Sequence, residues 1–163
     1  NKKFKNIRFV IGIGSNYTRF KVVEDLKKKK IFLRWGKVVS KNAIINGDVH
    51  IGDGAVVFSG VVISNESKIG DHCFIGPNSC LEHNNIFNNF SSCGAGVNCG
   101  GRVSVGKYSF LGIGTSVKHQ ISIKDNCVIG GQSLVIKNCL KNSLYFGIPA
   151  KKKRNWKFSY KYL

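Results

Sequence analysis

The sequence predicts an all-β protein, a parallel β-helix of hexapeptide repeats with about five coils and a small α/β segment before it. Three observations predict this fold. An apolar residue recurs at every sixth position, a small residue recurs in phase with it, and glycine often follows the apolar one. The pattern runs without a gap through residues 43–138, as sixteen hexads. At three hexads a coil, these hexads account for the five coils.

The apolar row begins at Ile45 and ends at Val135, and all sixteen of its members are apolar. The residue two places earlier, from Ala43 to Ser133, is small or β-branched in nearly every repeat. In a three-sided prism the large residue fills the interior and the small one faces inward beside a corner. Polar residues stand outside or in the turns, where glycine and asparagine accept left-handed dihedrals. Residues 18 apart then stack at the strand-pairing distance of about 4.8 Å.

The segments on either side of the prism are predicted as separate parts. Residues 1–42 are expected to form a strand–helix–strand segment. It would contain a strand over residues 8–14, a helix capped by Ser15 or Asn16 and running to about Lys30, and a short strand over residues 31–35. Residues 139–163 are expected to be a closing loop and then a basic, aromatic tail.

The formal net charge of +18 invites a nucleic-acid partner, but its distribution argues against one. Residues 1–42 hold 13 basic and 2 acidic side chains, residues 43–138 hold 6 of each, and residues 139–163 hold 7 basic and no acidic ones, which gives +11, 0 and +7. Because the excess avoids the repeat, we expect no nucleic-acid partner. Basic flanks also suit phosphate-bearing small molecules, an anionic membrane surface or simple solubility.

Neither a membrane helix nor a signal peptide is expected. No apolar run reaches the length of a membrane span, and no apolar h-region follows the basic N-terminus. The chain begins with Asn1 and contains no methionine, so we expect the natural start to lie upstream. We expect a cytoplasmic protein.

The six cysteines are expected to be structural. They form no C-x-x-C pair and no cysteine–histidine cluster with zinc spacing, so no metal is expected. Four of them occupy repeat positions for small or apolar residues and should be reduced, buried thiols: Cys73, Cys93, Cys99 and Cys127.

Two of the four histidines are candidates for chemistry because of their spacing. His83 and His119 are 36 residues apart, which is two coils, so they are expected at one corner with Gly101 midway between them. A histidine acts as a general base near neutral pH, and an exposed glycine amide one coil away can donate to an oxyanion. His50 and His72 have no partner in the sequence and are expected on the solvated surface.

Several motifs, in order along the chain, resemble one family of hexapeptide acyltransferases. They are residues 79–83 (SCLEH), 94–103 (GAGVNCGGRV), 110–115 (FLGIGT) and 147–151 (GIPAK). The family comprises the bacterial sialic-acid O-acetyltransferases and UDP-4-amino-sugar N-acetyltransferases (the NeuD/PglD type), and the similarity covers roughly residues 7–151. The resemblance implies a left-handed parallel β-helix, an exception to the right-handed crossovers of ordinary parallel sheets.

The resemblance also implies an acetyl-CoA-dependent acetyltransferase for a sugar or UDP-sugar. His83 would deprotonate the attacking amine or hydroxyl, the Gly101 amide would bind the thioester oxygen, and no acyl-enzyme would form. Glu82 is a further catalytic candidate, as a group that orients His83. Family members are homotrimers with acetyl-CoA between adjacent prisms. The expected contacts of CoA are Gly101, Gly112, Gly130, Gly147, Ile148, Pro149 and Lys151. The expected contacts of the acceptor are Gly12, Gly14 and Asn16.

Three departures from the family pattern bear on these expectations. An acidic residue often follows the family's histidine, where this chain has Asn84. A second family histidine corresponds to Ser92. Of the N-terminal Rossmann-like domain, the chain has only the later part, the strand that ends in residues 12–16 and the helix after it.

Three other functions share this fold. A hexapeptide acetyltransferase for another small acceptor, such as serine or an antibiotic, would bind that acceptor elsewhere. A γ-class carbonic anhydrase needs three zinc-binding histidines, which the histidine spacing does not supply. A catalytically inactive β-helix scaffold agrees with Asn84 and with the partial N-terminal domain.

Overall fold

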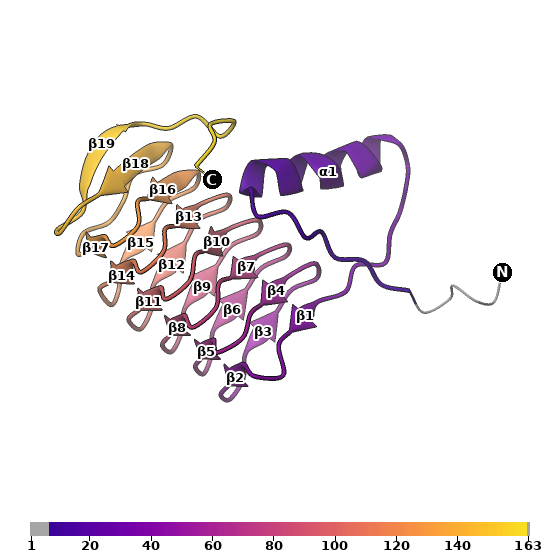
Figure 1. Ribbon diagram of the computed structural model, residues 1–163, viewed down its shortest axis with the longest axis horizontal. Coiled ribbons are helices and arrows are strands. Elements are labelled where there is room, and N and C mark those ends of the chain that lie inside the picture. Colours follow the sequence, from indigo (N-terminus) through magenta and orange to yellow (C-terminus); the bar gives the residue numbers. More distant parts are fainter. Residues whose placement is uncertain (1–6, 163) are drawn as a thin grey trace.

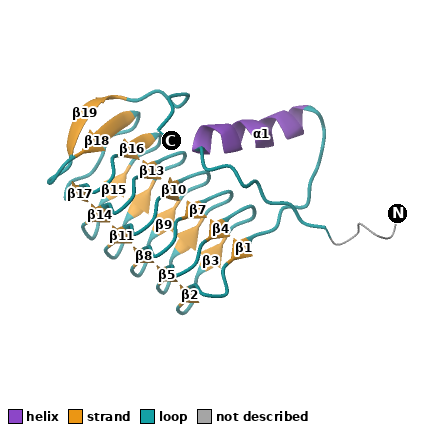
Figure 2. Ribbon diagram, viewed as in Figure 1, coloured by secondary structure: helices purple, strands orange, loops and turns teal. Residues whose placement is uncertain are grey.

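The fold is a three-sided parallel β-helix with one helix along an edge (Figures 1 and 2). The computed structural model, which describes residues 7–162, contains sheets of eight, six and five strands. Each coil contributes one short strand to each sheet, and partner strands are 18 residues apart, as in the pairing of Asn98 with Ser116. The predicted hexads are confirmed, in about six turns.

The chain passes from the first sheet to the second and then the third in every coil. The first sheet contains β1 (Val38–Val39), β4 (Val56–Val57), β7 (Phe74–Ile75), β10 (Ser92–Cys93), β13 (Phe110–Leu111), β16 (Cys127–Ile129), β18 (Ser143–Phe146) and β19 (Lys151–Asn155). The second contains β2 (Ile44–Ile45), β5 (Val62–Ile63), β8 (Cys80–Leu81), β11 (Asn98–Cys99), β14 (Ser116–Val117) and β17 (Leu134–Val135). The third contains β3 (His50–Ile51), β6 (Lys68–Ile69), β9 (Ile86–Phe87), β12 (Ser104–Val105) and β15 (Ser122–Ile123).

Strand pairing extends past both expected limits of the prism, residues 43 and 138. At the start, β1 pairs with β4. At the end, β18 adds a parallel strand to β16, and β19 returns antiparallel to β18. The region expected as a closing loop therefore contains a hairpin. The hairpin satisfies backbone groups that the last coil would otherwise leave unpaired at the open end of the sheet.

Each corner turns at a residue with left-handed backbone geometry. From Gly54 to Gln132, every sixth residue has a positive φ, whether it is a glycine, an asparagine, a glutamate or an aromatic residue. The positions that follow the apolar row are glycine for a different reason, which is steric. A Cβ on Gly76 would lie 2.5 Å from the backbone of Gly94 in the next coil, so these positions are glycine because the coils approach closely.

The apolar row and the inward-facing small residues form one continuous core. Cys73, Cys93, Cys99 and Cys127 are buried in it as free thiols, as expected. Burial raises the pKa of the Cys73 and Cys93 thiols to about 11, which keeps both protonated and unreactive at neutral pH.

The helix α1 (Asn16–Lys28) lies along the corner between the third and first sheets, called here the helix corner. Ser15 caps it and accepts a hydrogen bond from the N–H of Thr18 at 3.3 Å, so the predicted start is confirmed and the end falls two residues early. Within residues 7–162, no helix has the length and apolar character needed to span a bilayer.

The two strands expected beside the helix are not formed. A single parallel bridge between Phe9 and Trp35 remains of them. Residues 7–9 and 31–32 are exposed, so these segments lack a third strand or a covered face to pack against.

An aromatic ladder holds α1 at the helix corner. His72, Phe90 and Tyr108 stack one per coil, with ring centroids 4.8 and 5.9 Å apart. Phe20 of α1 packs edge-on against Phe90 at 5.5 Å, and Trp35 packs edge-on against His72 at 4.8 Å. His72 is therefore buried, and the expectation of a solvated side chain is wrong because the N-terminal segment covers it.

The C-terminal segment packs back onto the helix and the ladder. Phe158 contacts the rings of Tyr17, Phe20 and Tyr108. The hydroxyl of Tyr162 accepts a hydrogen bond from the N–H of Asn16 at 2.8 Å. The expected tail is thus part of the fold, and it joins the two flanks of the chain.

Burial of His72 makes stability depend on pH. Burial lowers the pKa of His72 from its ordinary value of 6.5, and no described residue hydrogen-bonds to its Nδ1. As the pH falls, the unfolded chain takes up this proton before the folded one does. His72 has a higher pKa in the unfolded chain than in the folded one. Between these two pKa values, each decrease in pH therefore lowers the free energy of unfolding.

We expect His72→Phe to remove this cost. The stability of the variant relative to the wild type should rise as the pH falls from about 7 to about 5. Urea unfolding at several pH values measures this difference, and a difference that does not change with pH would contradict the account.

Candidate active site

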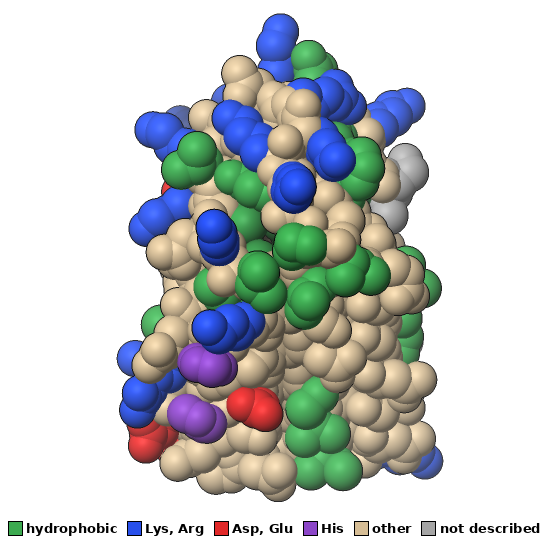
Figure 3. Space-filling model, turned by 90° about the vertical axis from the view of Figure 1, so that its left-hand side faces the viewer, with side chains coloured by type: hydrophobic (Ala, Val, Ile, Leu, Met, Phe, Trp, Pro, Cys, Tyr) green, Lys and Arg blue, Asp and Glu red, His purple; other side chains and the backbone are tan. Residues whose placement is uncertain are grey.

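The corner between the second and third sheets, called here the histidine corner, stacks His83, Gly101 and His119 one coil apart, as the spacing predicts. The N–H of Arg102 donates to the carbonyl of His83 at 2.9 Å, and the N–H of Gln120 donates to the carbonyl of Gly101 at 2.9 Å. These residues and Glu82 line a pocket of about 250 Å³. Figure 3 shows two histidines close together on the surface beside an acidic side chain, with lysines and arginines gathered toward the other end.

His83 uses its Nδ1 atom for a hydrogen bond within the corner. Nδ1 lies 2.7 Å from Oδ1 of Asn84. An amide oxygen only accepts hydrogen bonds, so in the neutral ring this contact favours the tautomer with the proton on Nδ1 and the lone pair on Nε2. The amide nitrogen of Asn84 in turn donates to Oε2 of Glu66 at 2.5 Å.

The Nε2 edge of His83 lies directly against Gly101. A Cβ on Gly101 would overlap Nε2 and would lie 2.7 Å from Cε1, so only glycine leaves room for the imidazole. Gly101 is buried under this ring, whereas the sequence predicted an exposed amide. The 18-residue register fixes the position of Gly101. The direction of the His83 side chain determines that Gly101 is buried.

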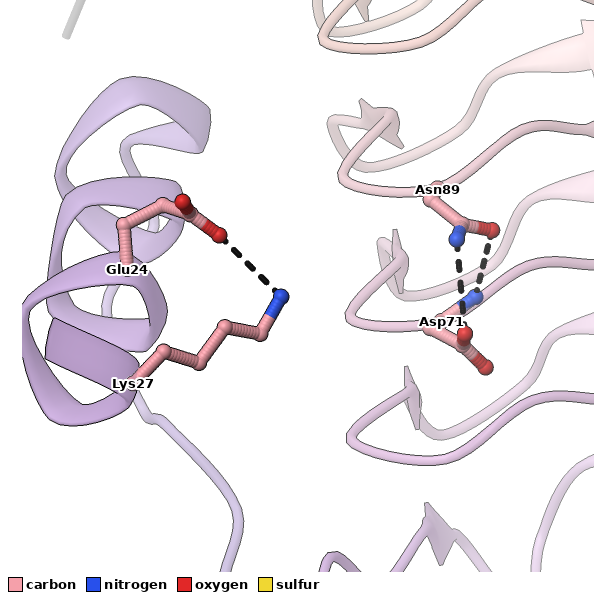
Figure 4. A network of polar contacts seen from close by, with 4 residues as sticks. All are labelled: Glu24, Lys27, Asp71 and Asn89. Carbon is pink, nitrogen blue, oxygen red and sulfur yellow. Dashed lines mark hydrogen bonds and ion pairs between the residues drawn. The ribbon is translucent and has the colours of Figure 1, made fainter. Parts of the chain in front are cut away.

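The N–H of Gly101 donates to no other residue among 7–162. At the same hexad position of the helix corner, the N–H of Asp71 donates to Oδ1 of Asn89 at 3.0 Å, one coil on (Figure 4). The residue one coil on from Gly101 is His119, and no such bond forms. The Gly101 N–H is thus left without a partner among residues 7–162.

Glu82 lines the same pocket without contacting His83 by a hydrogen bond. Its carboxylate makes no hydrogen bond or ion pair with any residue that the structure describes. The expected orienting contact from Glu82 is therefore not formed, because Asn84 is the partner of Nδ1.

The three acceptor candidates lie at the helix corner, away from His83. Asn16 is fully buried, and its Oδ1 accepts from Oγ of Ser92 at 2.6 Å and from Nη2 of Arg19 at 2.6 Å. The carbonyl of Gly14 accepts from Nη1 of Arg19 at 3.0 Å, and Gly12 is exposed. The side chain of Asn16 is committed to anchoring α1, which corrects the expectation that it meets the acceptor. Ser92, which donates to Asn16, has the same anchoring role.

Two of the CoA candidates lie at the corner between the first and second sheets, called here the glycine corner. A Cβ on Gly112 would lie 2.5 Å from the N atom of Gly131, and one on Gly130 would lie 2.8 Å from Cβ of Phe146. Both glycines allow successive coils to approach closely.

The other CoA candidates form the turn of the β18–β19 hairpin, beside the glycine corner. The N–H of Leu134 in β17 donates to the carbonyl of Gly147 at 3.0 Å, and the N–H of Ala150 donates back to the carbonyl of Leu134 at 2.8 Å. Three candidate side chains are exposed on this turn: Ile148, Pro149 and Lys151. Except for Gly101, the structure therefore gathers the CoA candidates at a different edge of the prism from His83.

Residues 7–162 contain no cluster of three or more side chains that could hold a metal ion. The four basic residues of β19, Lys151 to Arg154, are all exposed. They give the hairpin a strongly positive outer edge.

Comparison with known proteins agrees with the repeat. Residues 68–82 and 102–135 match a profile described as the hexapeptide repeat of succinyl-transferase. Both stretches lie within the predicted repeat, residues 43–138. PerB from Caulobacter crescentus, solved in complex with CoA and GDP-perosamine, is 28% identical to this chain. That match covers 90% of this chain and 70% of PerB, with a TM-score of 0.86.

Two further solved structures share the fold at lower identity. The acetyltransferase domain of PglB from Neisseria gonorrhoeae, in complex with acetyl coenzyme A, is 18% identical over 90% of this chain and 70% of that one, with a TM-score of 0.84. AntD, an N-acyltransferase from Bacillus cereus in complex with dTDP and 3-hydroxybutyryl-CoA, is 17% identical over 83% and 88%, with a TM-score of 0.68. These two structures show the same fold, and the match to PerB supports the resemblance to hexapeptide-repeat sugar acetyltransferases.

Glu66 belongs to the histidine corner, although the repeat pattern does not single it out. Glu66 is 18 residues before Asn84, so the register alone places the two side by side. The 18-residue spacing was a signal in the sequence, but only the direction of the Asn84 amide shows that the two side chains interact.

Proposed function

We propose that this chain is an acetyl-CoA-dependent acetyltransferase that acts on an amino or hydroxyl group of a sugar or nucleotide sugar. The observation that carries the proposal is the contact between His83 and Gly101, in which Nε2 lies against a glycine whose N–H has no partner among residues 7–162. CoA and a GDP-linked amino sugar in the PerB complex, and acetyl-CoA in the PglB complex, support the two substrate classes.

In the proposed reaction, Nε2 of His83 takes a proton from the acceptor as the acceptor nitrogen or oxygen attacks the thioester carbonyl. The new bond to carbon forms while the carbonyl electrons move to the oxygen. The N–H of Gly101 stabilises the resulting oxyanion. When the carbonyl re-forms, the carbon–sulfur bond breaks, and the CoA sulfur leaves and receives the proton from His83. No acyl-enzyme is required.

The distance between the candidate base and the candidate CoA contacts within one chain supports a homotrimer. His83 and most of the CoA candidates occupy different corners of one prism. A neighbouring prism can bring its glycine corner and hairpin against the histidine corner of the first. Gly112, Gly130 and the turn formed by residues 147–151 would then bind CoA, and the ammonium of Lys151 suits its phosphates.

For the acceptor, the exposed backbone at Gly12 and Gly14 remains the proposed contact, without the side chain of Asn16. Acetyl-CoA and nucleotide sugars are cytoplasmic metabolites, so we also propose the cytoplasm as the place of action.

The test is release of free CoA thiol from acetyl-CoA in the presence of each of a panel of acceptors. The panel contains GDP-, UDP- and dTDP-linked 4-amino sugars, the corresponding hydroxy sugars, and serine. We expect release that depends on a nucleotide amino sugar. Release with serine alone would indicate a different acceptor class, and binding of CoA without release for any acceptor would favour the inactive scaffold.

A further inference from the structure

We propose that Glu66 is a positioning residue for His83 and that it acts through the side-chain amide of Asn84. The proposal rests on the proposed function, in which His83 is the general base. Glu66 itself touches neither His83 nor the reacting atoms.

The fold holds Glu66 and Asn84 in register. They are 18 residues apart and occupy the same turn position in successive coils, with φ values of 59° and 58°. The backbone is fixed here by a hydrogen bond from the N–H of Asn84 to the carbonyl of Asn65 at 2.9 Å. Both side chains therefore leave the same corner side by side, and Oε2 of Glu66 accepts from Nδ2 of Asn84 at 2.5 Å.

The chemistry of the carboxylate determines which way the Asn84 amide points. The ionised side chain of Glu66 can only accept hydrogen bonds, so Asn84 must turn its NH₂ group toward Glu66 and its oxygen toward His83. With the amide reversed, the NH₂ group would face Nδ1, and the proton would move to Nε2. That tautomer of His83 could not remove a proton from the acceptor. Glu66 thus selects the tautomer that the proposed reaction needs.

The surroundings of Glu66 leave it free for this role. Its carboxylate forms no ion pair within residues 7–162, and its other hydrogen bond is a long one, 3.5 Å, from the side-chain amide of Asn65. The adjacent pocket also contains Asp48, Lys68 and His50, one coil below or on the neighbouring strands. Asp48 is the residue one coil before Glu66 and makes no side-chain hydrogen bond, so it offers a matched control for a nearby acidic charge.

The test compares Glu66→Gln with Asp48→Asn in the full chain. We expect Glu66→Gln to lower kcat by about 2- to 10-fold, because a glutamine amide can donate to Asn84 as well as accept from it, so the Asn84 amide is no longer held in one direction and part of the His83 population carries its proton on Nε2. KM for acetyl-CoA and the unfolding midpoint should stay the same. Asp48→Asn removes the same charge without touching Asn84 and should leave kcat unchanged.

A double variant distinguishes positioning from a merely structural role. In Glu66→Gln/Asn84→Asp, the new carboxylate at position 84 accepts from Nδ1, and the new amide at position 66 donates to that carboxylate. The donor and acceptor directions of the wild type are restored, so we expect kcat to recover most of the loss. Gln120 and Gln132 already occupy the same left-handed turn position in this chain, so the glutamine fits.

A direct readout does not require activity. The ¹⁵N chemical shifts of the neutral His83 ring report which nitrogen carries the proton. We expect the Nδ1–H tautomer in the wild type and in Asp48→Asn, and a shift toward Nε2–H in Glu66→Gln. An unchanged tautomer in Glu66→Gln, or a kcat for it equal to that of Asp48→Asn, would overturn the proposal. Failure of the proposed function is a separate result, in which the wild type transfers no acetyl group while the tautomer still shifts as expected.

Discussion

His83→Ala is expected to lower the rate of acetyl transfer by about 100- to 10,000-fold, the usual contribution of a general base. Without the imidazole, the acceptor amine or hydroxyl must attack with no group to take its proton. His83 is exposed and contributes nothing to the core, so the unfolding free energy and the affinity for CoA should stay close to the wild-type values.

The measurement is kcat from thiol release, with CoA binding followed by calorimetric titration. His50→Ala is the matched control, because His50 is also exposed but lies on the third sheet, outside the histidine corner. Equal kcat values for the two variants would contradict the role of His83.

Arg19→Ala is expected to cost about 3 kcal/mol of unfolding free energy, because it removes charged hydrogen bonds and leaves buried carbonyl groups without a donor. Arg19 is fully buried, and its guanidinium donates to the carbonyls of His72 at 2.8 Å and Ile13 at 2.7 Å and also lies over the ring of Phe74. Burial lowers the pKa of Arg19 to about 10, so the side chain still carries its charge at neutral pH.

Urea unfolding followed by circular dichroism measures this loss. Lys21→Ala is the control, since Lys21 lies on the same helix with its ammonium 3.9 Å from Asp25 in a solvent-exposed pair. Such pairs contribute little, and we expect a change below about 1 kcal/mol. A similar effect of both substitutions would show that Arg19 does not hold α1 on the prism.

The prism could be predicted because its physics is periodic. One apolar residue in six fills each face, and the 18-residue coil then places His83, Gly101 and His119 in one column without further information. The same periodicity explains why the free N–H of Gly101 could be proposed as a donor. What periodicity does not specify is the direction of a side chain, so the burial of Gly101 under the imidazole could not be foreseen.

The flanks could not be predicted to the same degree, because they are held by contacts between segments far apart in the sequence. Asn16 and Arg19 read as ordinary helix residues, yet both are buried against the helix corner. His72 has the polarity of a surface residue, but Trp35 and Phe90 enclose it. No local pattern indicates these contacts.

Asn84 departs from the pattern of the resembling family but still hydrogen-bonds to His83. In the sequence alone, Asn84 in place of the family's frequent acidic residue argues against His83 as a strong base. In the structure, a carboxylate one coil away lies behind it, so the histidine still meets a fixed acceptor.

The most direct test of the central claim is to follow an isotopic label from acetyl-CoA. Wild type and His83→Ala would each be incubated with acetyl-labelled CoA thioester and a nucleotide-linked 4-amino sugar, and the protein and sugar would be analysed separately by mass spectrometry. We expect label in the sugar for the wild type only, one free CoA thiol for each labelled sugar, and no label on the protein. Label retained covalently on the protein, or equal labelling of the sugar by His83→Ala, would contradict direct transfer with His83 as the base.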